Sequence, residues 1–159
     1  MATVRIITVG NLKEAYLREA LGEYKKRISQ YARVEEVELK EERITDEDNK
    51  AAIDRALALE GERILGAAKD GGFKIALCVE GKQLSSEELA ATVAKAVDEG
   101  GKLTFIIGSS HGLCDSVKRS CDLRLSFSKL TFPHQLMRVV LTEAIYRSFT
   151  IIAGKKYHK

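Results

Sequence analysis

The sequence predicts an α/β fold with a mainly parallel sheet and helices on both of its faces, in a single domain over residues 1–159. Two observations predict it. Short apolar runs such as 4–9 (VRIITV) and 103–107 (LTFII) alternate with longer segments of helical periodicity. Glycines follow several of these runs, as Gly10 and Gly108 do, where a strand gives way to a loop. In open sheets of this kind, ligands bind beyond the carboxyl ends of the strands.

In the first half of the chain, strand and helix patterns alternate around charged connections. Residues 4–9 are mostly β-branched, which indicates a buried strand, and 12–28 repeats apolar residues at helical spacing. Residues 34–39 alternate apolar and acidic side chains, as a half-exposed strand does. After a charged connection, Thr45-Asp46 is expected to cap a helix that runs to about residue 68.

The second half continues the alternation. Strands are expected at 73–79, 103–107 and 123–127, and helices at 89–97, 113–120 and 133–148. Gly81 is expected to turn the chain after the first of these strands. Ser85-Ser86, followed by two glutamates, indicates the start of a helix that ends at Gly100-Gly101. Pro133 suits the first position of the last helix, and Thr131 is expected to cap it.

Bulk composition is that of an ordinary globular protein, with 45% hydrophobic and 31% charged residues. No apolar run approaches the roughly 18–20 residues that span a bilayer, and no signal peptide pattern opens the chain. The three cysteines have neither disulfide nor zinc spacing, and no histidine or carboxylate cluster has metal-ligand spacing. We therefore expect a cytoplasmic protein with no metal and no membrane partner.

Charge is distributed unevenly along the chain. From Lys118 to the end there are nine Lys or Arg and two Asp or Glu, a net charge of +7. Residues 1–117 hold 17 basic and 21 acidic residues, a net charge of −4. So basic a C-terminal part favours an anionic partner, most simply a nucleic acid. The alternative is a chance clustering of basic residues with a basic tail.

One motif favours a serine hydrolase. Residues 108–112 (GSSHG) match the G-x-S-x-G pattern of serine hydrolases, between a predicted strand and a predicted helix. Ser110 would be the nucleophile and His134 the base, oriented by Asp115 or Asp122. The competing interpretation is that both glycines only allow a tight turn close to a ligand. Neither a dinucleotide-binding nor a P-loop motif is present.

The entry to the last helix carries more polar chemistry than a core helix needs. Ser126, Ser128, Lys129 and His134 gather at the end of a predicted strand. Further along the same helix lie Arg138, Glu143 and Arg147, which on most helices form a solvated face. Beside a ligand-binding loop, arginines commonly bind phosphate oxygens through paired hydrogen bonds. The residues alone leave two readings open, an anion-binding enzyme site and a non-catalytic RNA-binding module.

Four stretches resemble one family. They are 126–147 (SFSKLTFPHQLMRVVLTEAIYR), 77–90 (LCVEGKQLSSEELA), 105–113 (FIIGSSHGL) and the ending YHK. Together with the opening of the chain, they are similar to ribosomal RNA large subunit methyltransferase H, a family of SPOUT methyltransferases. The resemblance implies a C-terminal trefoil knot, a homodimer and S-adenosylmethionine as cofactor. It also implies methylation at N3 of a pseudouridine in the helix 69 loop of 23S rRNA, on the large subunit or the assembled ribosome.

The resemblance also assigns site residues. Cofactor contacts are expected at Leu77, Gly108, Phe127, Ser128, Lys129, Leu130, Thr131 and Phe132. The residues expected around the reacting pseudouridine are His134, Arg138, Glu143, Arg147, Tyr157 and His158. Either His134 or His158 would take its proton as general base, or an arginine would stabilise its imide anion. The tail residues are expected to complete the pocket of the opposite subunit. Where the family commonly has two glycines, this chain has Gly108-Ser109, and a positive φ at Ser109 would be strained.

Overall fold

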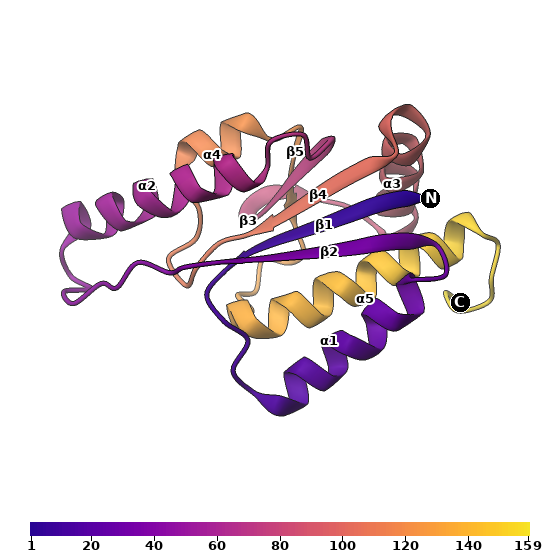
Figure 1. The fold of residues 1–159 in the computed structure, drawn as a ribbon, viewed down its shortest axis with the longest axis horizontal. Helices are drawn as coiled ribbons and strands as arrows, with labels where there is room; N and C mark the ends of the chain where they lie inside the picture. The colour runs from indigo at the N-terminus through magenta and orange to yellow at the C-terminus, as the bar shows by residue number, and fades with distance from the viewer.

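The fold is described by a computed structural model that covers all of residues 1–159 (Figure 1). Strands are β1 (Ala2–Val9), β2 (Ala32–Leu39), β3 (Phe73–Gln83), β4 (Lys102–Ile107) and β5 (Leu123–Ser126). Helices are α1 (Ala15–Ile28), α2 (Lys50–Ala67), α3 (Ser86–Gly100), α4 (Asp115–Ser120) and α5 (His134–Ile152). The predicted order of alternating strands and helices is confirmed. None of these helices combines the length and the apolar character needed to cross a membrane.

All five strands pair in parallel, in the order β2-β1-β4-β3-β5. β4 lies in the middle, and every residue from Leu103 to Ile107 is buried, which explains its uninterrupted apolar and β-branched sequence. Because the strands are parallel, the carboxyl ends of β3, β4 and β5 meet at one edge of the sheet. Strand pairing does not describe how the C-terminal part is threaded, so the trefoil knot stays a prediction.

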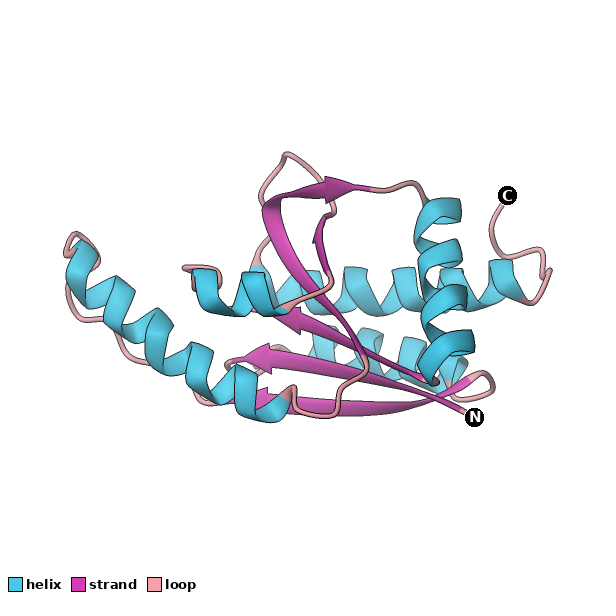
Figure 2. Cartoon of the chain, turned by 90° about the horizontal axis from the view of Figure 1, so that it is seen from above, coloured by secondary structure: helices cyan, strands magenta, loops and turns pink.

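Helices cover both faces of the sheet, as predicted (Figures 1 and 2). On one face, α1, α3 and α5 enclose the larger core, which includes Phe105, Leu141 and Ile145. On the other face, α2 and α4 cover a smaller core around Ile64 and Ile106. Within the larger layer, α5 packs against both α1 and α3. The last helix is therefore the central helix of its layer.

Two boundaries in the middle of the chain differ from the prediction. α2 begins at Lys50 and is capped by Asn49, whose side chain accepts from Ala52 N at 3.1 Å, rather than by Thr45-Asp46. β3 continues through Gly81 instead of turning there, with a register shift against β5 between Leu77 and Lys82. A Cβ on Gly81 would lie 2.8 Å from the backbone of Arg124. The glycine therefore allows two backbones to approach closely, a role that the sequence pattern does not distinguish from a turn.

Two helix starts show how well local signals predict caps. α3 has the predicted start in full, since Ser85 and Glu88 form a reciprocal capping box. α5 begins at His134, one residue later than predicted, so Pro133 is its N-cap rather than its first helical residue, and no side chain caps it. The prediction that Thr131 caps this helix is wrong. Its hydroxyl is consequently not used by the helix and faces the site described next.

Candidate active site

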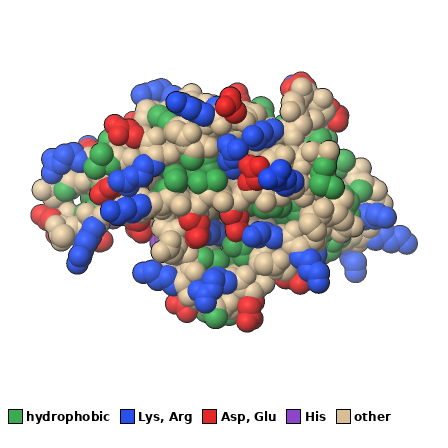
Figure 3. Space-filling model, in the orientation of Figure 1, with side chains coloured by type: hydrophobic (Ala, Val, Ile, Leu, Met, Phe, Trp, Pro, Cys, Tyr) green, Lys and Arg blue, Asp and Glu red, His purple; other side chains and the backbone are tan.

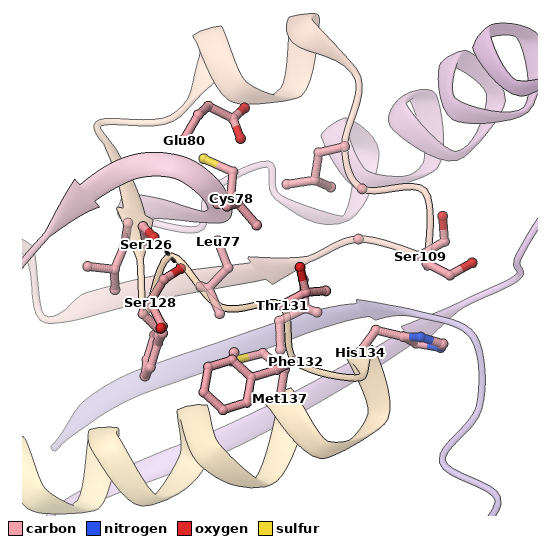
Figure 4. A pocket seen from close by; sticks show the side chains of 18 of the residues that line it. Leu77, Cys78, Glu80, Ser109, Ser126, Ser128, Thr131, Phe132, His134 and Met137 are labelled. Carbon is pink, nitrogen blue, oxygen red and sulfur yellow. Dashed lines mark hydrogen bonds between the residues drawn. The ribbon is translucent and has the colours of Figure 1, made fainter. Parts of the chain in front are cut away.

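A pocket of about 670 Å³ opens at the carboxyl ends of β3, β4 and β5, beside the first turn of α5. Eight predicted site residues line it: Leu77, Gly108, Phe127, Ser128, Leu130, Thr131, Phe132 and His134. Figure 4 shows side chains gathered around this space, with Glu80 and Cys78 on one side and Phe132 and Met137 on the other. The structure thus brings together all the predicted cofactor residues except Lys129, which is exposed and does not line the pocket.

The loop from β4 to α4 forms one wall of the pocket and folds tightly. A Cβ on Gly108 would lie 2.3 Å from the carbonyl oxygen of Gly112, so only glycine fits there. Gly112 has φ +88°, whereas Ser109 does not have a positive φ, so the strain considered for serine does not arise. Ser109 and Gly112 form an isolated β-bridge, and the Ser109 hydroxyl donates to Glu60 Oε1 at 3.0 Å. The serine is held by a partner on α2.

The segment between β5 and α5 forms the opposite wall and hydrogen-bonds largely with itself. Ser126 Oγ donates to the carbonyl oxygen of Ser128 at 3.1 Å, and Leu130 N donates to Ser128 Oγ at 3.0 Å. These bonds shape the loop without using helix or sheet partners. Leu130 carries a large apolar side chain in this segment and is 76% exposed.

Several pocket residues were not predicted, notably Cys78, Glu80 and Lys118. Glu80 and Lys118 form an ion pair, which raises the pKa of Lys118 and lowers that of Glu80 through their mutual hydrogen bond. Burial raises the pKa of the Cys78 thiol. The position of Glu80 after a buried strand was a usable signal, because strand ends supply ligand sites. Lys118 comes from α4, and only the folded chain brings it to Glu80.

The hydrolase arrangement is not formed. Ser110 is exposed and has no side-chain hydrogen bond, and no hydrogen bond joins any serine to a histidine. Asp122 accepts from the backbone N of Lys74 at 2.8 Å, so it does not orient His134. The glycines of 108–112 shape the pocket wall, which was the competing interpretation of that motif.

Four of the remaining predicted residues form a second cluster, toward the C-terminal end of α5. We call it the tail cluster and define it as Glu143, Arg147, Tyr157 and His158. Arg147 and the Tyr157 hydroxyl both donate to Glu143 Oε1, at 2.6 Å and 3.0 Å. The Arg147 guanidinium also lies 4.8 Å from the centre of the Tyr157 ring. Burial, followed by the hydrogen bond to Glu143, raises the pKa of Tyr157 to about 12.

His158 has contacts at both of its ring nitrogens. Nδ1 lies 3.0 Å from an Arg147 nitrogen, which can only donate, so Nδ1 accepts. Nε2 lies 2.7 Å from Glu87 Oε1 on the first turn of α3, and there it donates. The contact with His158 in turn lowers the pKa of Glu87. Within one protomer this histidine has no free nitrogen for a substrate, whereas His134 makes no side-chain hydrogen bond.

Arg138 corrects the sequence-based picture. Its side chain is only 5% exposed and pairs with Glu38 on β2 at 2.6 Å, while a second nitrogen donates to the carbonyl oxygen of Gly10. This guanidinium joins α5 to the sheet edge and faces away from solvent. Arg138 was expected to contact the RNA, but its guanidinium joins α5 to β2 inside the protein. Helical periodicity turns position 138 toward the sheet.

The pocket and the tail cluster lie far apart in one protomer. His134 and Arg147 are 13 residues apart on α5, which corresponds to about 20 Å along the helix axis. The side chains of one protomer therefore divide into a pocket at one end of α5 and a hydrogen-bonded cluster at the other. Figure 3 shows basic and acidic side chains mixed over one face, with basic ones at the end where Figure 1 places the C-terminus.

Comparison with known proteins identifies the family. A family model described as a predicted SPOUT methyltransferase matches residues 2–158. The proteins named ribosomal RNA large subunit methyltransferase H from Caldicellulosiruptor bescii and Caldicellulosiruptor saccharolyticus are 51% and 47% identical to the chain, each over 98% of it and 99% of the relative. A solved structure of a probable methylase family protein from Haemophilus influenzae Rd KW20 has a TM-score of 0.57 at 15% identity, covering 98% of this chain and 70% of that one, and supports the fold alone. The chain belongs to the SPOUT methyltransferases, in the family of ribosomal RNA large subunit methyltransferase H.

Proposed function

We propose that the protein transfers a methyl group from S-adenosylmethionine to N3 of a pseudouridine in the helix 69 loop of 23S rRNA. The observation that carries this proposal is the pocket, which joins three strand ends to the segment 127–133 in a chain of the methyltransferase family. The names of the two Caldicellulosiruptor relatives support ribosomal RNA as the substrate. The particular nucleotide rests on the sequence resemblance.

The residues of the pocket fit the cofactor. Its volume of about 670 Å³ lies in the range that is typical of small-molecule sites. Leu77 and Phe127 supply apolar surface, and Thr131 supplies a hydroxyl that the helix leaves unused. The missing Cβ of Gly108 leaves room for a backbone that approaches closely. When bound, S-adenosylmethionine supplies an electrophilic methyl group, and the protein contributes position and orientation.

Removal of the proton from the target nitrogen is the chemical task that remains for the protein. His134 lines the pocket and its ring makes no hydrogen bond, so one nitrogen is available to accept that proton. His158 is less suitable, since Arg147 and Glu87 occupy both of its nitrogens. We therefore propose His134 as the general base. Arg147, held by Glu143, would stabilise the negative charge that develops on the target pseudouridine as it loses its proton.

A second protomer would bring these two groups together. In one chain Arg147 lies about 20 Å from His134, too far for both to act on one nucleotide. A homodimer in which the tail cluster of one protomer meets the pocket of its partner removes this distance. The exposed Leu130 at the pocket is available for such a contact.

The nucleic acid would be bound chiefly through charge. The C-terminal part of net charge +7 is the only strongly basic part of the sequence, and a dimer doubles it. Following the sequence resemblance, we take the assembled subunit or ribosome as the proposed substrate rather than free RNA. A ribosomal substrate also agrees with the expected cytoplasmic location. Binding should weaken steeply as salt is raised.

The test compares 23S rRNA from cells with and without the gene by mass spectrometry of the helix 69 fragment. We expect one methyl group on a pseudouridine in the wild type and none in the deletion strain. Complementation with His134→Ala should leave that methyl group largely absent, whereas Ser110→Ala should restore it. An unchanged fragment in the deletion strain would overturn the proposed substrate.

A non-catalytic RNA-binding module is the second candidate, favoured by the basic C-terminal part alone. Calorimetry with S-adenosylhomocysteine separates the two candidates. A methyltransferase binds it in the pocket, and a binding module has no reason to do so. Absence of binding at millimolar ligand would favour the module.

A further inference from the structure

A buried carboxylate on α2 touches the pocket wall from behind. Glu60 is 3% exposed, and both of its oxygens are used. Oε1 accepts from the hydroxyl of Ser109 at 3.0 Å, and Oε2 accepts from the backbone N of Glu42 at 2.9 Å. Ser109 belongs to the β4–α4 loop that lines the pocket, and Glu42 belongs to the charged connection before α2.

The neighbouring residue holds the same loop at its other end. A Cβ on Gly61 would lie 2.4 Å from Cys114 Sγ, so α2 and the end of the β4–α4 loop are in close contact there. Two consecutive residues of α2 thus hold the loop at Ser109 and at Cys114. Between these points the loop includes His111, whose Nε2 faces Glu47 of the connection at 3.9 Å.

Burying the carboxylate of Glu60 costs folding free energy that an apolar side chain filling the same space would not cost. No cation pairs with it, and a carboxylate removed from water is unfavourable unless hydrogen bonds compensate. An apolar side chain of similar volume would often serve a core position as well or better. What the carboxylate provides instead is two acceptors that point at two different loops.

We propose that Glu60 is a positioning residue of the methyl-donor pocket, fixing the pocket wall through Ser109 and coupling it to the 40–49 connection through Glu42. The proposal rests on the proposed function, because it assumes that the methyl donor occupies this pocket. If the wall is already fixed in the free protein, less conformational entropy is lost when the ligand binds. By linkage, a ligand that orders the wall also orders the connection.

The experiment measures binding of S-adenosylhomocysteine by calorimetry and hydrogen exchange of residues 108–114 in the free protein. Ser109→Ala is the mild variant and Glu60→Ala the severe one, and each should weaken binding about five- to tenfold. Exchange of the loop should rise in both. The double variant should bind no more weakly than Glu60→Ala, because Glu60→Ala already removes the hydrogen bond between Ser109 and Glu60.

Two further variants separate positioning from stability. Glu60→Gln should recover most of the affinity, since its amide oxygen can accept from Glu42 N while its NH₂ group donates to Ser109. Arg5→Gln is the control, because Arg5 pairs with Glu35 and donates to the carbonyl oxygens of Ala67 and Lys69, and contacts neither the pocket nor the 40–49 connection. It should lower the melting temperature and leave affinity within about twofold.

Wild-type affinity in both Ser109→Ala and Glu60→Ala would overturn the proposal. So would an equal loss in Arg5→Gln, since that would show an effect of stability alone. If the wild type bound no ligand, the proposed function would fail. In that case increased loop exchange in Ser109→Ala and Glu60→Ala would support only the part in which Glu60 fixes the loop, and unchanged exchange would refute that part as well.

Discussion

The two ends of α5 differ in how much of their polar chemistry is already used. At the N-terminal end, no side chain caps the helix, and His134 makes no side-chain hydrogen bond. At the C-terminal end, Glu143, Arg147, Tyr157 and His158 all bond to one another or to Glu87. One end has groups available for ligands, and the other end is internally satisfied.

This difference indicates separate tasks for two regions that the sequence places on a single helix. A site must leave donors and acceptors free, whereas a cluster that is to be presented to a partner must hold its own shape first. The tail cluster is built in that way, around the single carboxylate of Glu143. Changing each region separately tests the comparison.

Removal of residues 157–159 has the largest expected effect on activity. We expect methylation to fall below detection, because Tyr157 and His158 no longer hold Arg147 and Glu143 in place. Affinity for S-adenosylhomocysteine should remain within about threefold, since none of the three residues lines the pocket. Methyl transfer to ribosomes and calorimetry on the same preparation provide the two readings. Full activity of the truncated protein would exclude the tail from the site.

Gly108→Ala tests the pocket end. Its Cβ would meet the carbonyl oxygen of Gly112 at 2.3 Å, so the wall must shift, and cofactor affinity should fall roughly 100-fold. Gly100→Ala is the matched control, because a Cβ there meets nothing within 4 Å and the φ is not positive. Calorimetry should find the control unchanged. Equal affinities in both variants would show that the β4–α4 loop does not contact the cofactor.

Arg138→Met distinguishes the buried arginine of α5 from Arg147. Loss of the guanidinium leaves Glu38 and the Gly10 carbonyl oxygen without their partner, and we expect a loss of about 2–3 kcal/mol in unfolding free energy. Chemical denaturation measures it. Activity per folded molecule should stay near that of the wild type, while Arg147→Met should show the reverse pattern. A stable but inactive Arg138→Met would return this residue to the reaction site.

Tyr157 gives the smallest effect, and one that depends on pH. Its pKa is raised to about 12, first by burial and then by the bond to Glu143, so the folded state keeps the proton longer than the unfolded state. Its contribution is therefore complete below about pH 10 and is lost as pH rises toward 12. Denaturation midpoints should fall over this window in the wild type and fall less in Tyr157→Phe. Parallel curves for the two proteins would contradict the bond to Glu143.

The fold was largely predictable because its signals are local. β-branched runs such as Leu103–Ile107 indicate strands whatever the rest of the chain does, and the Ser85–Glu88 capping box predicts its own helix start. Gly81 was predicted wrongly, since its reason lies in the backbone of Arg124, which is 43 residues away in the sequence. Asn49 prevailed over Thr45-Asp46 as the cap of α2, a choice among nearby capping residues that sequence patterns leave open.

The site was predictable where it follows strand ends and not where it depends on helix rotation. Gly108 and the 127–132 segment lie at the carboxyl ends of strands, and parallel strands bring those ends together. Arg138 and Arg147 look equivalent in the sequence, yet one faces the sheet and the other faces the tail. Glu60 offered no signal at all, because a glutamate in a charged helix is ordinarily on the surface.

The central place of α5 between α1 and α3 bears on how the protein is synthesised. A growing chain makes α1 first and α3 much later, and the helix that packs between them comes last. Until α5 is added, the larger core lacks Leu141, Ile145 and Phe149, and the apolar surfaces that these side chains cover stay exposed. One wall of the pocket is also made late, since the 127–133 segment immediately precedes this helix. A nascent chain therefore gains the complete pocket and the complete larger core only late in synthesis, so a product interrupted before α5 exposes apolar surface and is aggregation-prone.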